Sequence, residues 1–453
     1  MKPTSIVISG EDWDALRERL FTPDGNENAG VLLCGASESA DERRLLVRQV
    51  VLAPESAYVN RTGFHLEVAP SFYNTIVGRC LADRLHPVII HSHRSDGAAW
   101  YSSSDDFGEQ RLLGVLAALL PHATPASLVL TNHGAIGRQL ERKGFTMLAS
   151  LRVAGAPSIK FDFDRKVRRT RVPKRFERQV RAFGEEGQRR LSGLRVGIVG
   201  TGGIGSLVAE QLVRAGVVNF TIVDPDVIEE SNVSRLFGAS KSDIQQFKAN
   251  VVARHLGTLG AKRVVAVRQT AIKQSTLLKL RGCDVLFCCV DNDRTRVVLS
   301  RFAHQYLIPM IDHGTRLDAR EGHITAAAGR VSIVGAGLTC LRCSYHINPE
   351  RIRAESMSRK ERAALAREGY VMGIDEPAPA VVSINTIVGG LGVTAGVNLF
   401  VNLTGHIQPF DQIYDARTGS VFPVTPRHEA GCDICDDVKG LKGLGDRQVV
   451  SAY

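Results

Sequence analysis

The chain has 453 residues, of which 44% are apolar and 23% charged, the composition of an ordinary soluble globular protein of two to three domains. Its net charge of +10 suggests an acidic partner or nucleic acid. Much of that excess lies between residues 160 and 178, without the aromatic ladder or fold motif of a nucleic-acid-binding protein. We therefore do not expect nucleic acid as a partner, and we interpret this run as a solvated linker.

Two features bear on the cellular compartment. The N-terminal residues lack the shape of a secretory signal peptide, and the long uncharged stretch at residues 383–405 is interpreted as a buried helix rather than a membrane span. The nine cysteines include two CxxC pairs, a pattern that favours a metal site over disulfides in a chain without a secretion signal. The pairs are Cys340/Cys343 and Cys432/Cys435. We expect a cytoplasmic protein with no membrane partner.

The first domain is expected at residues 1–154. Apolar residues at helical spacing predict a helix over residues 107–120, and Asp105 or Asp106 stands where its N-cap belongs. A basic linker, residues 155–174, is predicted to follow. The predicted strands of this domain are Thr4–Ser9 and residues 30–33, 46–52, 88–91 and 127–130.

Strands and helices alternate from residue 195 onward. This alternation predicts a Rossmann-like, doubly wound parallel sheet for the second domain, residues 175–453, so that the whole chain is of the α/β class. The irregular, charged residues 346–380 are predicted to form an exposed crossover. The predicted strands are Arg195–Val199 and residues 220–223, 264–267, 285–290 and 310–312, with a helix over residues 204–215.

The first domain carries a metal-ligand pattern. His91 and His93, two apart at the end of a predicted strand, point to the same side, and Asp105 is a plausible third ligand. Three nitrogen or oxygen ligands leave a fourth zinc position for water, which is typical of a catalytic site. Zinc lowers the pKa of such a water to about 7, and a general base and an oxyanion-stabilising hydroxyl would complete the chemistry.

This pattern resembles the JAMM metalloprotease family, which has an upstream Glu, then His-x-His, then Ser-x-x-Asp. The resemblance implies an α+β domain in which His91, His93 and Asp105 bind zinc. It also implies that Glu27, in the segment Glu-Asn-Ala-Gly-Val-Leu, is the acid/base and that Ser102 lies on the oxyanion side. The sequence departs from the family at Arg94, where many members have proline.

The second domain carries a glycine-rich turn, GTGGIG at residues 200–205, between a predicted strand and helix. Backbone N–H groups and the helix N-terminus can hold phosphate there, in an ATP-binding enzyme or in an NAD-dependent dehydrogenase. Asp224, after the next strand, would bind ribose hydroxyls in either case. The glycines of the turn are Gly200, Gly202, Gly203 and Gly205.

Polar residues downstream of Asp224 distinguish an ATP-binding enzyme from an NAD-dependent dehydrogenase. Asn232, Arg235 and Lys248 supply an amide and two cations, which hydride transfer does not need. Attack on an α-phosphate does need them, because charge builds on the phosphoryl oxygens and the leaving pyrophosphate. Asp291 and Asn292, closing the fourth predicted strand, can hold Mg²⁺.

These motifs resemble the superfamily of ubiquitin-activating and sulfur-carrier-adenylating enzymes, including ThiF- and MoeB-like proteins, over residues 171 to 440. The segment RFERQ at residues 175–179 and Arg296 add to the likeness. The resemblance implies a homodimer in which Arg178 reaches the partner subunit's ATP site, and a structural zinc on the four CxxC cysteines. Members that form a thioester carry a further cysteine, yet this sequence has none between Ser344 and Gly431.

Both halves therefore point to the C-terminal tail of a ubiquitin-like protein. The main interpretation is a zinc peptidase or isopeptidase that processes this tail, fused to an ATP-dependent adenylyltransferase that activates its carboxylate for conjugation, with a ubiquitin-conjugating-type partner. The first alternative is activation of a sulfur-carrier protein for cofactor or cysteine biosynthesis. A second is an NAD-dependent oxidoreductase, and a third a non-catalytic binding module.

Overall fold

The structure is a computed structural model, and it describes residues 2–163, 171–320, 323–358, 360–362, 379–406 and 409–450. The chain forms two compact units. The first is Met1–Arg169 with two short additions, Gln305–Leu307 and Lys442–Gln448, and the second comprises the remainder. Residues 164–170 of the predicted linker and residues 363–378 of the predicted crossover lie outside the described residues.

The first unit is built on a nine-stranded mixed sheet of order β11-β10-β1-β3-β2-β6-β7-β8-β9. A separate pair, β4 and β5, forms a small antiparallel hairpin. The strands are β1 Thr4–Ser9, β2 Ala29–Glu38, β3 Arg43–Leu52, β4 Tyr58–Arg61, β5 Leu66–Val68, β6 His86–Ser92, β7 Ala126–Leu130, β8 Ala135–Glu141, β9 Gly144–Met147, β10 Ser150–Ala154 and β11 Ile159–Asp162.

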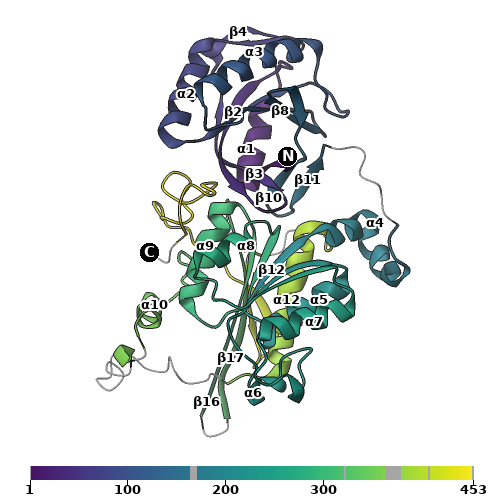
Figure 1. Ribbon diagram of the computed structural model, residues 1–453, viewed down its shortest axis with the longest axis vertical. Coiled ribbons are helices and arrows are strands. Elements are labelled where there is room, and N and C mark those ends of the chain that lie inside the picture. The colour runs from purple at the N-terminus through teal and green to yellow at the C-terminus, as the bar shows by residue number, and fades with distance from the viewer. Residues whose placement is uncertain are drawn as a thin grey trace. The chain divides into compact units, whose positions relative to one another are not determined.

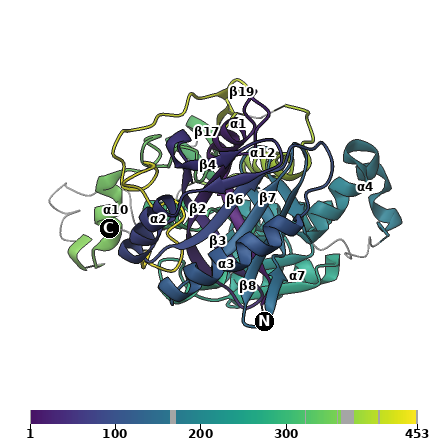
Figure 2. The same cartoon turned by 90° about the horizontal axis from the view of Figure 1, so that it is seen from above.

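Helices cover both faces of this sheet. Alternation along β2 sends Leu32 and Cys34 to the core under helix α1, and Val31 and Leu33 to the core under α2 and α3. Figure 2 looks onto the side that α2 and α3 cover. The helices are α1 Gly10–Leu20, η1 Glu55–Ala57, α2 Pro70–Asp83 and α3 Ser103–Leu119.

Two features of this unit were not expected from the sequence. Strand β11 pairs antiparallel with β10, so the sheet continues into the segment predicted to be linker. The segment Lys442–Gln448 also packs on β2, where Gly445 bridges Ala36 in parallel. The segment and β2 approach so closely that only glycine fits at Gly35, because a Cβ there would lie 2.1 Å from the carbonyl oxygen of Gly443.

The second unit is built on an eight-stranded sheet of order β14-β13-β12-β15-β16-β17-β18-β19. The first five strands are parallel, as predicted, and the last three are antiparallel additions. The strands are β12 Arg195–Val199, β13 Asn219–Val223, β14 Arg263–Val267, β15 Val285–Cys288, β16 Met310–Arg320, β17 His323–Val334, β18 Asp411–Asp415 and β19 Ser420–Pro423.

The helices of the second unit flank its sheet, with α8 and α9 on one side and α5, α7 and α12 on the other (Figure 1). Helix α12 packs on α5, β16 and β17. By length and composition it could cross a membrane, yet 61% of its most apolar window is buried, as expected for a core helix. The helices are η2 Lys174–Phe176, α4 Glu177–Gly193, α5 Gly203–Ala215, α6 Glu230–Val233, η3 Lys241–Asp243, α7 Lys248–Leu259, α8 Gln274–Leu280, α9 Asp293–Tyr306, α10 Pro349–Ser356 and α12 Val382–Val401.

Candidate functional site

The predicted metal ligands of the first unit converge at the end of β6. The Nε2 atoms of His91 and His93 lie 3.1 Å apart, and each lies 3.3 Å from a carboxylate oxygen of Asp105. Tetrahedral zinc with bonds of about 2.0–2.1 Å holds its donor atoms about 3.3 Å apart. Two imidazoles and a carboxylate at this spacing therefore fit a zinc ion.

Asp105 is positioned by the first turn of α3. Ser102 is the N-cap: its Oγ accepts a hydrogen bond from the Asp105 amide, while Asp105 Oδ2 accepts one from the Ser102 amide at 2.7 Å. The expectation that Asp105 or Asp106 caps the helix was therefore wrong. The capping box places the Ser102 hydroxyl next to a metal ligand, while Asp106 pairs with Arg138.

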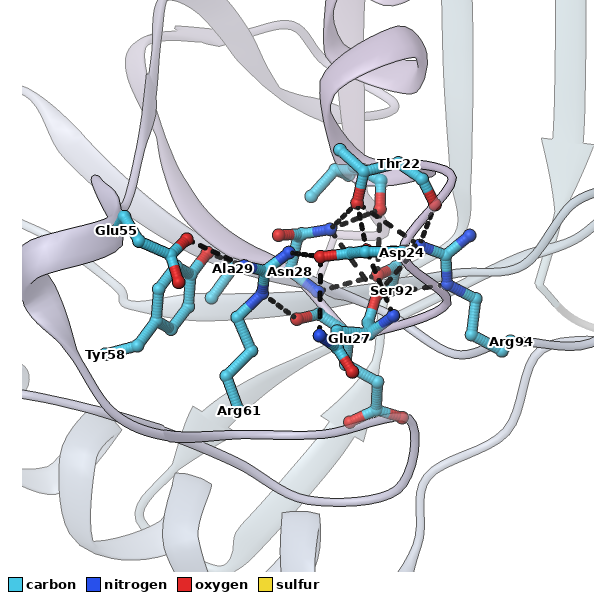
Figure 3. A network of polar contacts seen from close by, with 12 residues as sticks. Thr22, Asp24, Glu27, Asn28, Ala29, Glu55, Tyr58, Arg61, Ser92 and Arg94 are labelled. Carbon is cyan, nitrogen blue, oxygen red and sulfur yellow. Dashed lines mark hydrogen bonds and ion pairs between the residues drawn. The ribbon is translucent and has the colours of Figure 1, made fainter.

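Glu27 lies beside these ligands, just before β2. It is buried, with Oε1 3.9 Å from His93 Nε2, and its amide donates to the carbonyl oxygen of Thr62 at 2.9 Å. Burial raises the pKa of its carboxyl group. Figure 3 shows the Glu27 carboxylate extending away from a polar network that holds the surrounding loop.

Two neighbours of the ligands were missed by the sequence analysis. Trp100 packs on His93 with ring centroids 4.9 Å apart. Glu109, four residues after Asp105 on the same helix, brings a buried Oε1 without a hydrogen-bond partner to 3.9 Å from His91 Nδ1. The helical spacing of Asp105 and Glu109 was the available signal.

In the second unit, the glycine-rich turn connects β12 to α5. Gly200 has φ of +85°, and helix α5 begins at Gly203 with Gly202 as its N-cap. The amide of Thr201 donates to Asp224 at 2.6 Å and its hydroxyl at 2.9 Å, so the carboxylate braces the turn. Burial raises the pKa of Asp224. Thr201 is a contact that the sequence analysis did not anticipate.

The predicted cations gather near the start of α5 and α7. A Cβ on Gly203 would lie 3.4 Å from Cδ of Arg235, so this arginine packs on the turn. Lys248 is the first residue of α7, and its Nζ lies 3.0 Å from Asp226 Oδ2. Asn232 is buried in α6, where its Oδ1 accepts a hydrogen bond from the Glu229 amide.

Asp291 and Asn292 follow β15, the strand next to β12. The Asp291 residue is exposed, whereas Asn292 Oδ1 accepts a hydrogen bond from the Thr295 amide at 2.9 Å. Arg296, in the first turn of α9, is buried, and its Nη1 donates to Asp312 Oδ2 at 3.0 Å. The exposed carboxylate is therefore the better of the two proposed Mg²⁺ ligands.

The two CxxC pairs, 92 residues apart, meet in one cluster. Cys340 Sγ lies 3.8 Å from Cys432 Sγ, and Cys343 Sγ lies 3.7 Å from Cys435 Sγ. Tetrahedral zinc–thiolate bonds of about 2.3 Å place sulfurs about 3.8 Å apart, so the four donors fit a structural zinc ion. A hydrogen bond from Cys435 lowers the pKa of Cys340 to about 5.

The other cysteines and Arg178 lie apart from these clusters. Cys34, Cys80, Cys283 and Cys288 are buried core residues. Arg178 is exposed on α4 within its own chain.

Comparison with known proteins concerns the second unit. The chain is 29% identical to a sulfur carrier protein adenylyltransferase of Thermus thermophilus over 60% of this chain and 94% of that protein. It is 26% identical to ubiquitin-like modifier-activating enzyme 5 of Drosophila mojavensis and 30% identical to adenylyltransferase and sulfurtransferase MOCS3 of Drosophila willistoni. These alignments cover 54% and 59% of this chain, and 59% and 54% of the relatives, respectively.

Among solved structures, E. coli MccB with ATP aligns with a TM-score of 0.47 and 16% identity, covering 58% of this chain and 75% of that one. The ThiF family itself matches residues 176–434, more than half of the 453 residues. That match spans the glycine-rich turn, the cations after Asp224 and three of the four clustered cysteines. The protein therefore belongs to the ThiF family.

Proposed function

We propose that the second unit adenylates the C-terminal carboxylate of a sulfur-carrier protein, using ATP. One observation carries this proposal: in a member of the ThiF family, Arg235 packs on Gly203 at the start of α5, within a glycine-rich turn braced by Asp224. Lys248 begins α7 and lies next to Asp226, two residues after Asp224. The relatives named for sulfur-carrier adenylation and sulfur transfer favour this substrate over the conjugation first inferred from the sequence.

The proposed reaction consumes only the carrier carboxylate and ATP. A carboxylate oxygen of the carrier attacks the α-phosphorus of ATP, and the bond from that phosphorus to the bridging oxygen breaks. Pyrophosphate leaves and an acyl-adenylate remains. Arg235 and Lys248 stabilise the negative charge on the phosphoryl oxygens, while the helix N-terminus at Gly203 holds phosphate with its free amides.

Magnesium would be held by Asp291, with Asn292 beside it, and would offset charge on the phosphates. Because no cysteine occurs between Ser344 and Gly431, we expect the acyl group to pass to an external sulfur donor rather than to a thiol of this chain. Arg178 would complete the site of a partner subunit in a homodimer.

We also propose that the first unit is a zinc metallopeptidase that trims the carrier before activation. The ThiF match begins after this unit, so the proposal rests on the ligand geometry of His91, His93 and Asp105. A zinc ion held there would supply Lewis acidity and acidify a coordinated water. Glu27 would take up a proton and return it to the leaving amine, and the Ser102 hydroxyl would donate to the developing oxyanion.

Conjugation to a target protein is the second candidate function. The relative named ubiquitin-like modifier-activating enzyme 5 favours it. A metallopeptidase able to cleave isopeptide bonds would also suit removal of conjugates. In that case the thiol of a ubiquitin-conjugating-type partner would attack the carbonyl carbon of the acyl-adenylate, forming a thioester and releasing AMP.

ATP–pyrophosphate exchange tests these proposals together. Carrier and ubiquitin-like proteins from the same genome are supplied with and without residues beyond their terminal glycine. We expect exchange with trimmed carriers, and with extended ones only when Glu27 is intact, with Glu27→Gln as the comparison. A thiocarboxylate product detected by mass spectrometry supports sulfur transfer, and a protein conjugate supports the second candidate. No exchange with any of them would contradict the adenylation of such carriers.

A further inference from the structure

Arg94 occupies an unusual position, directly after His93 and against the loop that precedes β2. Its Nη2 donates to the carbonyl oxygen of Thr22 at 2.7 Å. Both Nε and Nη2 donate to the carbonyl oxygen of Asn26, at 3.0 and 2.8 Å. Nη2 also lies 3.8 Å from a carboxylate oxygen of Asp24. A single side chain thus ties both ends of the loop to the strand that bears a metal ligand.

Arg61 holds the same loop from the opposite side. Its Nη2 pairs with Asp24 at 2.5 Å, its Nη1 with Glu55 at 2.7 Å, and its Nε donates to the carbonyl oxygen of Glu27 at 3.3 Å. Figure 3 shows Arg94 and Arg61 on either side of Asp24, with Glu27 between them. The loop is therefore clamped between two guanidinium groups.

The backbone that follows Glu27 is also fixed in place. The Asn28 amide donates to Ser92 Oγ at 3.0 Å, so the residue after Glu27 is anchored on β6. The Asn28 side chain donates to the carbonyl oxygen of Leu20 at 3.0 Å. Without Arg94, the segment between Thr22 and Asn26 would lose the hydrogen bonds that tie it to the residue after His93.

We propose that Arg94 is a positioning residue, which holds the loop so that the Glu27 carboxylate stays beside the metal ligands. The inference rests on the proposed peptidase function and adds to it a residue that holds the proposed acid/base in place. The planar guanidinium donates to the Asn26 carbonyl oxygen from two nitrogens, Nε and Nη2, while Nη2 also reaches Thr22. A lysine ammonium has a single nitrogen and cannot reproduce this fork. The carboxylate itself does the proton transfer, and Arg94 acts through it.

Amide hydrogen exchange of the metal-free protein tests the clamp without an activity assay. In Arg94→Ala we expect exchange of the Glu27 and Asn28 amides to rise by about tenfold or more, because charge-assisted hydrogen bonds are lost. Arg94→Lys should give a smaller rise. The control is Arg17→Ala, since Arg17 also lies over the Phe21 ring but donates to Asn132 and not to the loop. Unchanged exchange in Arg94→Ala would overturn the proposal.

A double-mutant cycle then separates positioning from general stability. Arg94→Ala should lower kcat for trimming of an extended carrier by about 10- to 100-fold, with KM and zinc content unchanged. In a Glu27→Gln background, the residual trimming rate measured over long incubations should not fall further on the same substitution, because the group that Arg94 positions is gone. Equal loss in both backgrounds would refute positioning. If the wild-type protein does not cleave at all, the peptidase proposal falls, and hydrogen exchange alone decides the clamp.

Discussion

Gly205 provides a quantitative test of the nucleotide turn. A Cβ at this position would lie 1.8 Å from the carbonyl oxygen of Gly200, whereas real Cβ atoms essentially never approach closer than 3.0 Å. In Gly205→Ala the turn must therefore open by about 1.2 Å, the difference between these two distances. A misplacement of about 1 Å at a catalytic site can lower a rate by about 100-fold. We expect that loss in ATP–pyrophosphate exchange, with weaker MgATP binding by calorimetry.

Gly257→Ala is the matched control for this substitution. Gly257 lies in α7, and a Cβ there meets nothing within 4 Å. Alanine should therefore stabilise the helix by about 0.5–1 kcal/mol and leave MgATP binding unchanged. If Gly205→Ala binds MgATP and supports exchange as the wild type does, the turn is not the phosphate site.

Three further substitutions test other parts of the molecule. Lys248→Ala should lower exchange by about 100-fold or more, because a cation at the phosphates is lost, while zinc-dependent trimming continues; loss of both activities would contradict independent sites. Cys343→Ser should reduce the zinc content measured by metal analysis and lower the Tm, since a closed four-thiolate site stabilises the fold; unchanged zinc content would contradict the four-cysteine site. Arg178→Ala should slow exchange, and mixing with Lys248→Ala should restore activity if each subunit completes its partner's site; a fully active monomer would contradict this.

Local patterns predicted much of both units. Gly200 and the helix start at Gly203 lie within one turn, and the two imidazoles belong to His91 in β6 and His93 directly after its end, two residues apart. The parallel strands β12 to β16 were likewise predicted, because buried strands alternating with helices leave few other arrangements. Each of these features depends on residues close together in the chain.

Other features depend on residues distant in the chain, and local patterns could not reveal them. Strand β11 is short and half exposed, so its pairing with β10 left no clear periodicity. The antiparallel strands β18 and β19 and the packing of Lys442–Gln448 on β2 also depend on distant partners. A short segment of this kind is ordered by the backbone groups that its partner leaves free.

For the site, the sequence by itself determined which chemical groups are present: the imidazoles, Asp105, Glu27 and the four thiols. The tertiary structure decided how they meet. It brings Glu27 to 3.9 Å from His93, across 66 residues of chain, and it joins cysteines 92 residues apart. It also made Arg94 the clamp of the loop, 68 and 72 residues from the carbonyl groups to which it donates. Residue types set donor chemistry, whereas distances between donors arise only when sheet pairing and core packing fix the backbone.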